Sequence, residues 1–232
     1  SHIGWDGQFY YYQSNDIFAT KDASQHIDNP PYRYQRIGVP LMAGGIATLF
    51  GFETTPPILY LYLQLILVAS GFYFLAKWLR NKKISAIYGY GWILSIGVLN
   101  GLAYGMPDAV GDAMFIVAII AALQGKLIFY AIVSTFLLLV REGYAVFAAM
   151  VFGLTLFGSI PWDKYGKWGQ VMLTMLPGIV SIAWMGYVTI RFGKPHFQAA
   201  MGTHMTDWPF HGIWVTFWAA IEQKNWFEIF NK

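Results

Sequence analysis

Long apolar runs without a single charge constrain this sequence more than any other feature. Residues 54–76, 84–107, 143–162 and 168–190 contain no Asp, Glu, Lys or Arg. About 20 apolar residues in a helix cross the roughly 30 Å hydrocarbon core of a bilayer, and a helix satisfies its own backbone hydrogen bonds there. We therefore predict an all-α, polytopic transmembrane bundle.

The composition supports this prediction and excludes several classes of protein. Of the 232 residues, 56% are hydrophobic and only 12% are charged, too few to form the polar coat of a soluble domain. Aromatic residues make up 19%, as expected where Trp and Tyr lie at membrane interfaces. The net charge of +3 does not indicate a nucleic-acid partner. The lack of cysteine excludes disulfides, thiolate nucleophiles and Cys-ligated metals.

The run lengths divide the chain into segments. Residues 113–125 and 127–140 are each shorter than a span and predict two helices joined by a turn at residues 124–126, which gives about six spans within residues 57–190. Residues 1–56 are then a first outer loop whose apolar stretch, residues 37–52, is too short to span and predicts an interfacial helix. The whole chain is read as one transmembrane domain, a fragment that opens on Ser1.

Charges predict which segments share a side of the membrane. Lys77, Arg80, Lys82 and Lys83 form the densest basic cluster, which the positive-inside rule places in the cytoplasm. The first loop and the segment 191–232, with a predicted amphipathic helix at 212–221, are then outside. Counting residues 37–52 as a span would instead place residues 1–36 in the cytoplasm.

The outer side collects the charges that could carry chemistry. Charges at helix ends that face a bundle interior often mark a substrate site, because burying them in lipid is costly. The alternative is that these are ordinary loop charges. The residues at issue are Asp6, Asp16, Arg33, Arg36, Asp108, Asp112, Arg141 and Glu142.

Within the first loop, two features predict specific roles. Arg33 and Arg36 lie three residues apart, on one face if the stretch is helical, and paired guanidinium forks suit a phosphate. The less favoured alternative is that the two arginines snorkel to lipid headgroups. Asp6 precedes Gly7, a pair typical of a turn that exposes the carboxylate. The spacing of His196, His204 and His211 is no recognised zinc pattern and favours loop histidines.

These residues carry a resemblance to a known family. The first loop resembles that of bacterial membrane glycosyltransferases of the C-type (GT-C) fold, which take sugar from a polyprenyl-phosphate carrier. Asp6 stands alone where many of these enzymes have an acidic pair. The similar stretches are Trp5-Asp6-Gly7-Gln8-Phe9-Tyr10-Tyr11, Asp16-Ile17-Phe18, Pro31-Tyr32-Arg33-Tyr34-Gln35-Arg36-Ile37 and Pro40-Leu41, with weaker likeness at Arg141-Glu142, residues 191–193 and residues 208–212.

The resemblance implies an activity and roles for residues. It implies inverting hexosyl or pentosyl transfer to a glycan, lipid or protein acceptor at the outer face of the bacterial cytoplasmic membrane. Asp6 would be the catalytic base, and Arg33 and Arg36 would stabilise the departing phosphate. No cofactor is certain; a divalent metal is possible, but no feature of the sequence supports one. The implied substrate-binding residues are Arg33, Arg36, Tyr10, Asp16, Asp108, Asp112, Arg141 and Glu142.

Other classes of membrane protein remain open. A transporter usually carries charged or broken-helix sites near mid-membrane, and the uncharged runs count against it. A non-catalytic membrane subunit would share the architecture without needing Asp6. A polymerase or ligase that uses lipid-linked oligosaccharide in cell-surface glycan assembly would work at the same face.

Overall fold

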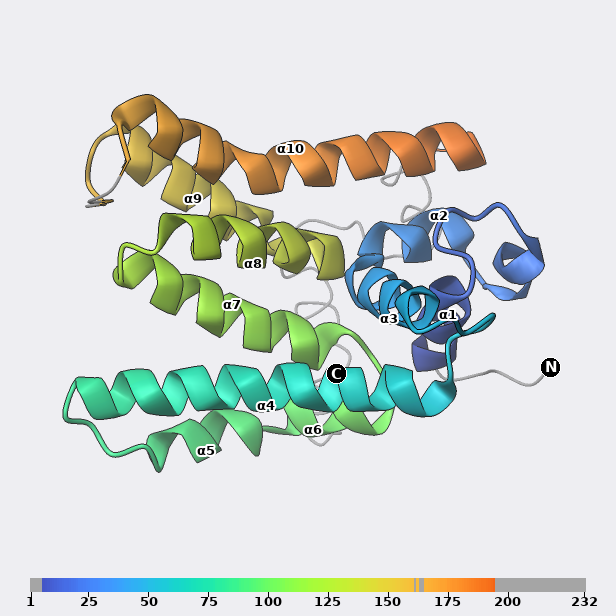
Figure 1. Cartoon of the computed structure of the whole chain (residues 1–232), viewed down its shortest axis with the longest axis horizontal. Coiled ribbons are helices and arrows are strands. Elements are labelled where there is room, and N and C mark those ends of the chain that lie inside the picture. Colours follow the sequence, from blue (N-terminus) through green and yellow to red (C-terminus); the bar gives the residue numbers. More distant parts are fainter. Residues whose placement is uncertain (1–5, 161, 163–164, 195–232) are drawn as a thin grey trace, which may run out of the picture.

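The computed structural model describes residues 6–160, 162 and 165–194, and this part of the chain consists of helices and their connections, with no strand. Figure 1 shows the long helices running along one axis, with the first three helices gathered at one end. The all-helical prediction is confirmed for these residues. The predicted amphipathic helix at 212–221 and the three C-terminal histidines lie outside the described residues.

Two of the described helices are long and apolar enough to cross a membrane. They are α4 (Pro57–Asn81, 25 residues) and α10 (Lys167–Phe192, 26 residues), each close to 40 Å long at about 1.5 Å per residue. α4 begins at Pro57, where the missing N–H leaves no helical hydrogen bond unmade. These two helices carry the structural support for a membrane location.

The next pair forms the predicted helical hairpin. α7 (Asp108–Leu123) and α8 (Leu127–Val140) are joined by a turn at residues 124–126, in which Gly125 has a φ of 67°. A left-handed φ suits glycine because it lacks a Cβ. The hairpin is confirmed, and its helices are about 24 and 21 Å long.

Residues 84–107 do not form the continuous helix that their lack of charge predicts. α5 (Tyr88–Ile93) and α6 (Ile96–Ala103) are separated by Leu94 and Ser95, and the Ser95 hydroxyl caps α6 by accepting a hydrogen bond from the Val98 amide at 3.5 Å. This prediction was wrong because hydropathy takes no account of a serine that can start a new helix. The run at 143–162 is also shorter as a helix: η3 (Glu142–Tyr144) leads into α9 (Ala145–Leu156).

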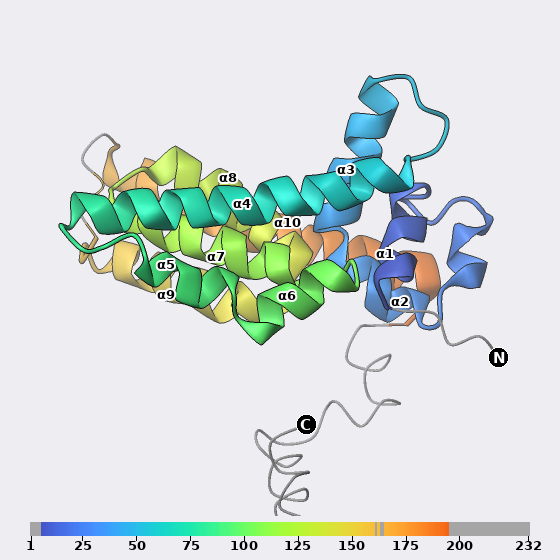
Figure 2. The same cartoon turned by 90° about the horizontal axis from the view of Figure 1, so that it is seen from below.

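The N-terminal part forms a cap on the bundle. It contains α1 (Asp6–Ser14), η1 (Asp22–His26), α2 (Pro30–Arg33), η2 (Tyr34–Arg36) and α3 (Gly38–Leu49). Figure 2 shows α3 projecting steeply from the long axis of α4. The 12-residue α3 is about 18 Å long, too short to span a bilayer. Its helical form is as predicted, and its interfacial position stays a prediction.

Chain reversals bring the outer-loop segments together at the capped end of the bundle. Gly38 packs on Val140 at the end of α8, and Arg191 near the end of α10 donates from Nε to the Ala19 carbonyl oxygen at 2.8 Å. The basic cluster of residues 77–83 lies at the other end of α4. The described parts of the segments predicted to share one side of the membrane thus share one end of the bundle.

Candidate functional site

Close backbone packing fixes α1 against the bundle. A Cβ built on Gly7 would lie 1.9 Å from the carbonyl oxygen of Tyr104, and one built on Gly44 of α3 would lie 2.4 Å from that of Ser14. Only glycine allows either approach. The sequence predicted a loop turn at Asp6 and Gly7, but these residues begin the helix α1. Gly7 is needed because its backbone lies directly against that of Tyr104.

Arg33 is the centre of the first ion-pair group. Its Nη2 donates to Asp6 Oδ1 at 2.8 Å, and its Nε and Nη2 donate to Asp28 Oδ1 and Oδ2, each at 3.0 Å. The Arg33 side chain is only 10% exposed, whereas those of Asp6 and Asp28 are 50% and 49% exposed. The guanidinium is thus held by two carboxylates that themselves face the surroundings.

Arg36 forms a second, separate pair. Its Nε and Nη2 donate to Glu142 Oε2 and Oε1 at 3.0 and 2.9 Å, a bidentate fork between side chains that are 16% and 22% exposed. The ring of Tyr32 lies near both cations, with its centroid 4.9 Å from Arg36 Cζ and 5.6 Å from Arg33 Cζ. The two guanidinium groups therefore flank one aromatic ring, which favours both cations electrostatically.

Burial and charge act in opposite directions on these groups. Burial disfavours both charged guanidinium groups, but hydrogen bonds to Asp28 and Asp6 raise the pKa of Arg33, and those to Glu142 raise the pKa of Arg36. Burial also raises the pKa of the Tyr10 hydroxyl, although Arg36 and Arg33 partly oppose it. Tyr10 is 2% exposed. Both arginines stay charged and Tyr10 stays a neutral phenol at neutral pH.

The start of α7 contributes a third group. Arg141 Nη1 pairs with Asp108 Oδ1 at 2.7 Å, and the Tyr144 hydroxyl donates to Asp112 Oδ1. Gly111, between the two aspartates, lies where a Cβ would approach the Tyr144 ring at 3.3 Å. Asp108 and Asp112 thus reach the capped end, as predicted, but through partners of their own.

Asp16 has a different environment from the other candidates. It is 3% exposed, and its two carboxylate oxygens accept hydrogen bonds from the backbone N–H groups of Thr20 and Lys21 at 2.8 and 2.9 Å. The carboxylate therefore closes a turn within its own loop. Tyr34 supports the same loop by donating its hydroxyl to the Asp16 carbonyl oxygen at 2.9 Å.

The structure brings the predicted residues to one end of the bundle. There they form separate ion pairs and do not all contact one another. Asp6 meets Arg33, while Arg36 meets Glu142 and Asp108 meets Arg141. Because charges at the edge of lipid are tolerated only when paired or hydrated, the sequence also predicts one cavity that receives Asp6, both arginines and Asp108 or Asp112, and this stays a prediction. Sequence reasoning missed Asp28 and Tyr32, although both lie within five residues of Arg33 and are polar or aromatic.

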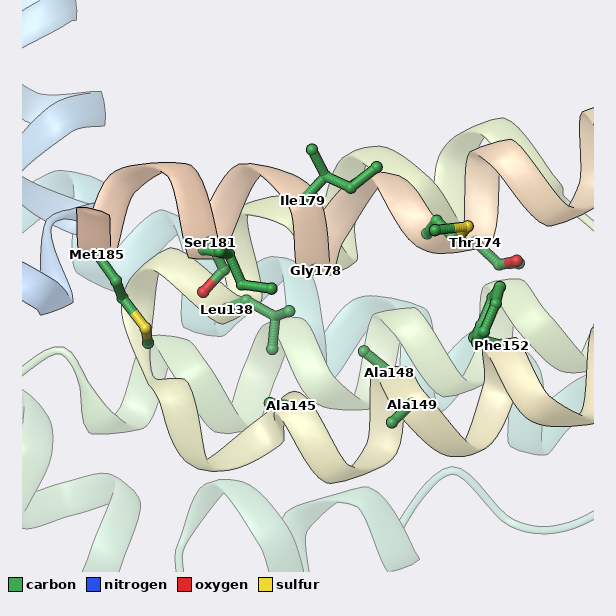
Figure 3. Close-up of a pocket in the computed structure, with 12 residues that line it drawn as sticks. Leu138, Ala145, Ala148, Ala149, Phe152, Thr174, Gly178, Ile179, Ser181 and Met185 are labelled. Atoms are coloured by element: carbon green, nitrogen blue, oxygen red, sulfur yellow. The ribbon is translucent and has the colours of Figure 1, made fainter. Parts of the chain in front are cut away.

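An apolar groove begins beside this end. It has a volume of about 380 Å³ between α9 and α10, backed by Leu138 of α8, and its lining has no charged side chain. Figure 3 shows Ala145 and Met185 at one end of the groove and Phe152 and Thr174 at the other. Ala145 directly follows Tyr144, the partner of Asp112, so the groove leads away from the ion pairs along the bundle.

No group of three or more His, Cys, Asp or Glu side chains among residues 6–160, 162 and 165–194 could hold a metal ion. Comparisons of the chain with protein-family models, curated proteins and solved structures find no match. Any assignment of function therefore depends on the residues described above and on the resemblance of the first loop.

Proposed function

We propose that this chain is the membrane core of a glycosyltransferase that moves a hexose or pentose from a polyprenyl-phosphate carrier to an acceptor hydroxyl. The observation that carries the proposal is that Arg33 and Arg36 flank Tyr32 beside the half-exposed carboxylate of Asp6. When a phosphate is the leaving group, a base can take the proton of the attacking hydroxyl and neighbouring cations can stabilise the charge on the phosphate.

Each guanidinium group keeps one nitrogen outside its ion pairs. The pairs engage Nε and Nη2 of each arginine, so Nη1 takes no part in them, and both arginines also hydrogen-bond to the Tyr10 hydroxyl. A phosphate oxygen would share these donors with Tyr10. The carboxylates fix the planes of both guanidinium groups. Negative charge that grows on a departing phosphate would then meet donors already in position, with little reorganisation.

The proposed reaction is one displacement at the anomeric carbon. An acceptor oxygen forms the new bond to this carbon while the bond from the carbon to the phosphate oxygen breaks, and the configuration inverts. Asp6 takes the acceptor proton, and the lipid phosphate leaves with the bonding electron pair. Arg33 accounts for one Asp6 oxygen, and half of the Asp6 side chain remains exposed to an approaching hydroxyl.

The polyprenyl chain would lie in the groove between α9 and α10. The groove is lined by apolar and small side chains and starts beside the polar end, so the phosphate and the hydrocarbon of one lipid would each meet matching chemistry. This placement assumes a GT-C-like arrangement in which α4, α5 with α6, α7, α8, η3 with α9, and α10 make six passes, and the capped end faces outward from the cytoplasmic membrane. Only α4 and α10 are by themselves long and apolar enough to span, among the described helices.

Binding of radiolabelled polyprenyl phosphate to the purified protein tests the role of the arginines. Arg36→Ala should weaken binding about tenfold, the worth of one charge-assisted hydrogen bond. Glu142→Gln is the matched control, because it removes the same ion pair but keeps the guanidinium, and it should bind at least as tightly as the parent. Equal losses in both variants would show that the ion pair supports the fold only, and would count against the proposal.

A non-catalytic membrane subunit is the second candidate. Each charged candidate described here has a partner within the protein, as expected of contacts that only hold the cap on the bundle. Such a subunit would tolerate replacement of Asp6 by Asn in the assembled complex, whereas the enzyme would not.

A further inference from the structure

The end of the bundle opposite the cap is rich in basic side chains. Lys77, Arg80, Lys82 and Lys83 lie at the end of α4, and Lys126 lies in the turn between α7 and α8. The sequence has no Asp or Glu in residues 54–107 or 113–141. In the part of the chain that the structure describes, all four ion pairs lie at the capped end. Among the described residues, none of these cations forms an ion pair with a carboxylate.

Two of these basic residues line a hollow between α4 and α5. Its volume is about 430 Å³, and Lys77, Arg80 and Asn81 form its polar wall. Lys77 and Arg80 are three residues apart on α4 and so lie on one helix face. The Nζ atom of Lys77 lies 5.8 Å from the centroid of the Tyr73 ring, which holds this cation at the edge of the hollow.

Part of the lining is apolar. Phe72 and Ala76 of α4 and Ala86 of the loop before α5 form this part, all only partly exposed. The ring of Phe72 packs against the Tyr90 ring of α5, with centroids 5.0 Å apart, and both residues line the hollow. Donors for an anion thus stand directly beside a surface that suits hydrocarbon.

We propose that this hollow binds the headgroup phosphate of an anionic phospholipid, with an acyl chain against Phe72 and Ala76. Lys77, Arg80 and the Asn81 amide donate to the phosphate oxygens, and the chain covers the apolar wall. Charge complementarity favours an anionic lipid over a zwitterionic one, since no Asp or Glu is among the described residues that line the hollow to balance a choline or ethanolamine group. The site is remote from Asp6 and does not depend on the proposed glycosyl transfer.

Native mass spectrometry of the full chain in mild detergent, titrated with phosphatidylglycerol or phosphatidylcholine, tests this proposal. We expect one phosphatidylglycerol to bind in preference to phosphatidylcholine. Lys77→Gln with Arg80→Gln should weaken its binding about tenfold or more, because each cation near an anionic headgroup contributes a factor of about five. Ala86→Trp, which keeps both charges but fills the hollow, should weaken binding as well.

Lys83→Gln with Lys126→Gln is the matched control, since it removes the same charge from the same end outside the hollow. If it weakens binding as much as the Lys77 and Arg80 pair, attraction is diffuse and the proposal fails. Equal binding of phosphatidylcholine would also overturn it. Inorganic phosphate and glycerol phosphate should not displace the lipid at equal concentration; if they do, the site recognises a free phosphate and not a phospholipid.

Discussion

Arg36 and Glu142 are 106 positions apart in the sequence and form a bidentate ion pair, with N···O distances of 3.0 and 2.9 Å. The pair ties the first loop to the start of η3, and both side chains are less than a quarter exposed. It thus connects the cap to the bundle beside the Tyr32 ring, which also lies near Arg33.

Removing the acidic partner should destabilise the protein. Glu142→Gln leaves the Arg36 guanidinium partly buried without its counter-charge, and we expect a loss of about 1–3 kcal/mol in the free energy of unfolding. Thermal unfolding in detergent, followed by tryptophan fluorescence, would measure it. Glu53→Gln, at an exposed position, is the control and should be neutral. Equal melting temperatures for Glu142→Gln and the parent would contradict this role of the pair.

The Asp28 pair predicts a pH dependence. Burial alone would raise the pKa of Asp28, but hydrogen bonding and charge from Arg33 outweigh it and lower the pKa below 3.8. A carboxyl group with a depressed folded-state pKa contributes stability above its unfolded pKa and loses it as the pH falls through the folded value. The stability difference between the parent and Asp28→Asn should therefore persist from pH 7 to about 5 and vanish well below 3.8. A difference that stays constant down to pH 2.5 would refute the pairing.

Gly7 predicts a steric effect on the cap. Gly7→Ala places a Cβ 1.9 Å from the Tyr104 carbonyl oxygen, so α1 must shift. We expect a loss of about 1–3 kcal/mol in unfolding free energy, similar to overpacking of a core. Gly45→Ala, on an exposed face of α3 with no atom within 4 Å, should be neutral or stabilise by up to about 1 kcal/mol. The same melting temperature in both variants would show that α1 does not pack on Tyr104, in the connection between α6 and α7.

The membrane arrangement can be tested directly because the chain lacks cysteine. Cysteine introduced at Ser24, in the cap, and at Asn81, at the end of α4, should react with an impermeant maleimide from opposite sides of the membrane. Intact cells should label the first and not the second. Labelling of both from one side would exclude the proposed outward orientation of the cap.

The sequence predicted those parts of the fold that local patterns encode. The turn at residues 124–126 has a glycine and a lysine between two apolar runs, and the structure places the hairpin there. Arg33 and Arg36 end α2 and η2, as the expected helical stretch requires. The break at Ser95 was missed because the chain remains uncharged through it, and a hydroxyl cap depends on backbone angles rather than on hydropathy.

The contacts of the candidate site were less predictable. Arg33 pairs with Asp6 across 27 positions and Arg36 pairs with Glu142 across 106, separations over which a single sequence carries no pairing signal. The convergence of charges at one end could be predicted, since alternating passes bring every second loop to the same end. Which carboxylate meets which arginine depends on side-chain packing that only the structure provides.

Glycosyl transfer by Asp6→Asn tests the central claim most directly. In membranes supplied with radiolabelled polyprenyl-phosphate-linked sugar, the parent protein should release polyprenyl phosphate. Asp6→Asn should reduce the rate of this release by about 100-fold or more, because the variant lacks the base. Its affinity for the donor lipid should stay within a few fold of that of the parent. Asp22→Asn, at an exposed position in the same loop, should retain full activity. Unchanged turnover in Asp6→Asn would contradict the account.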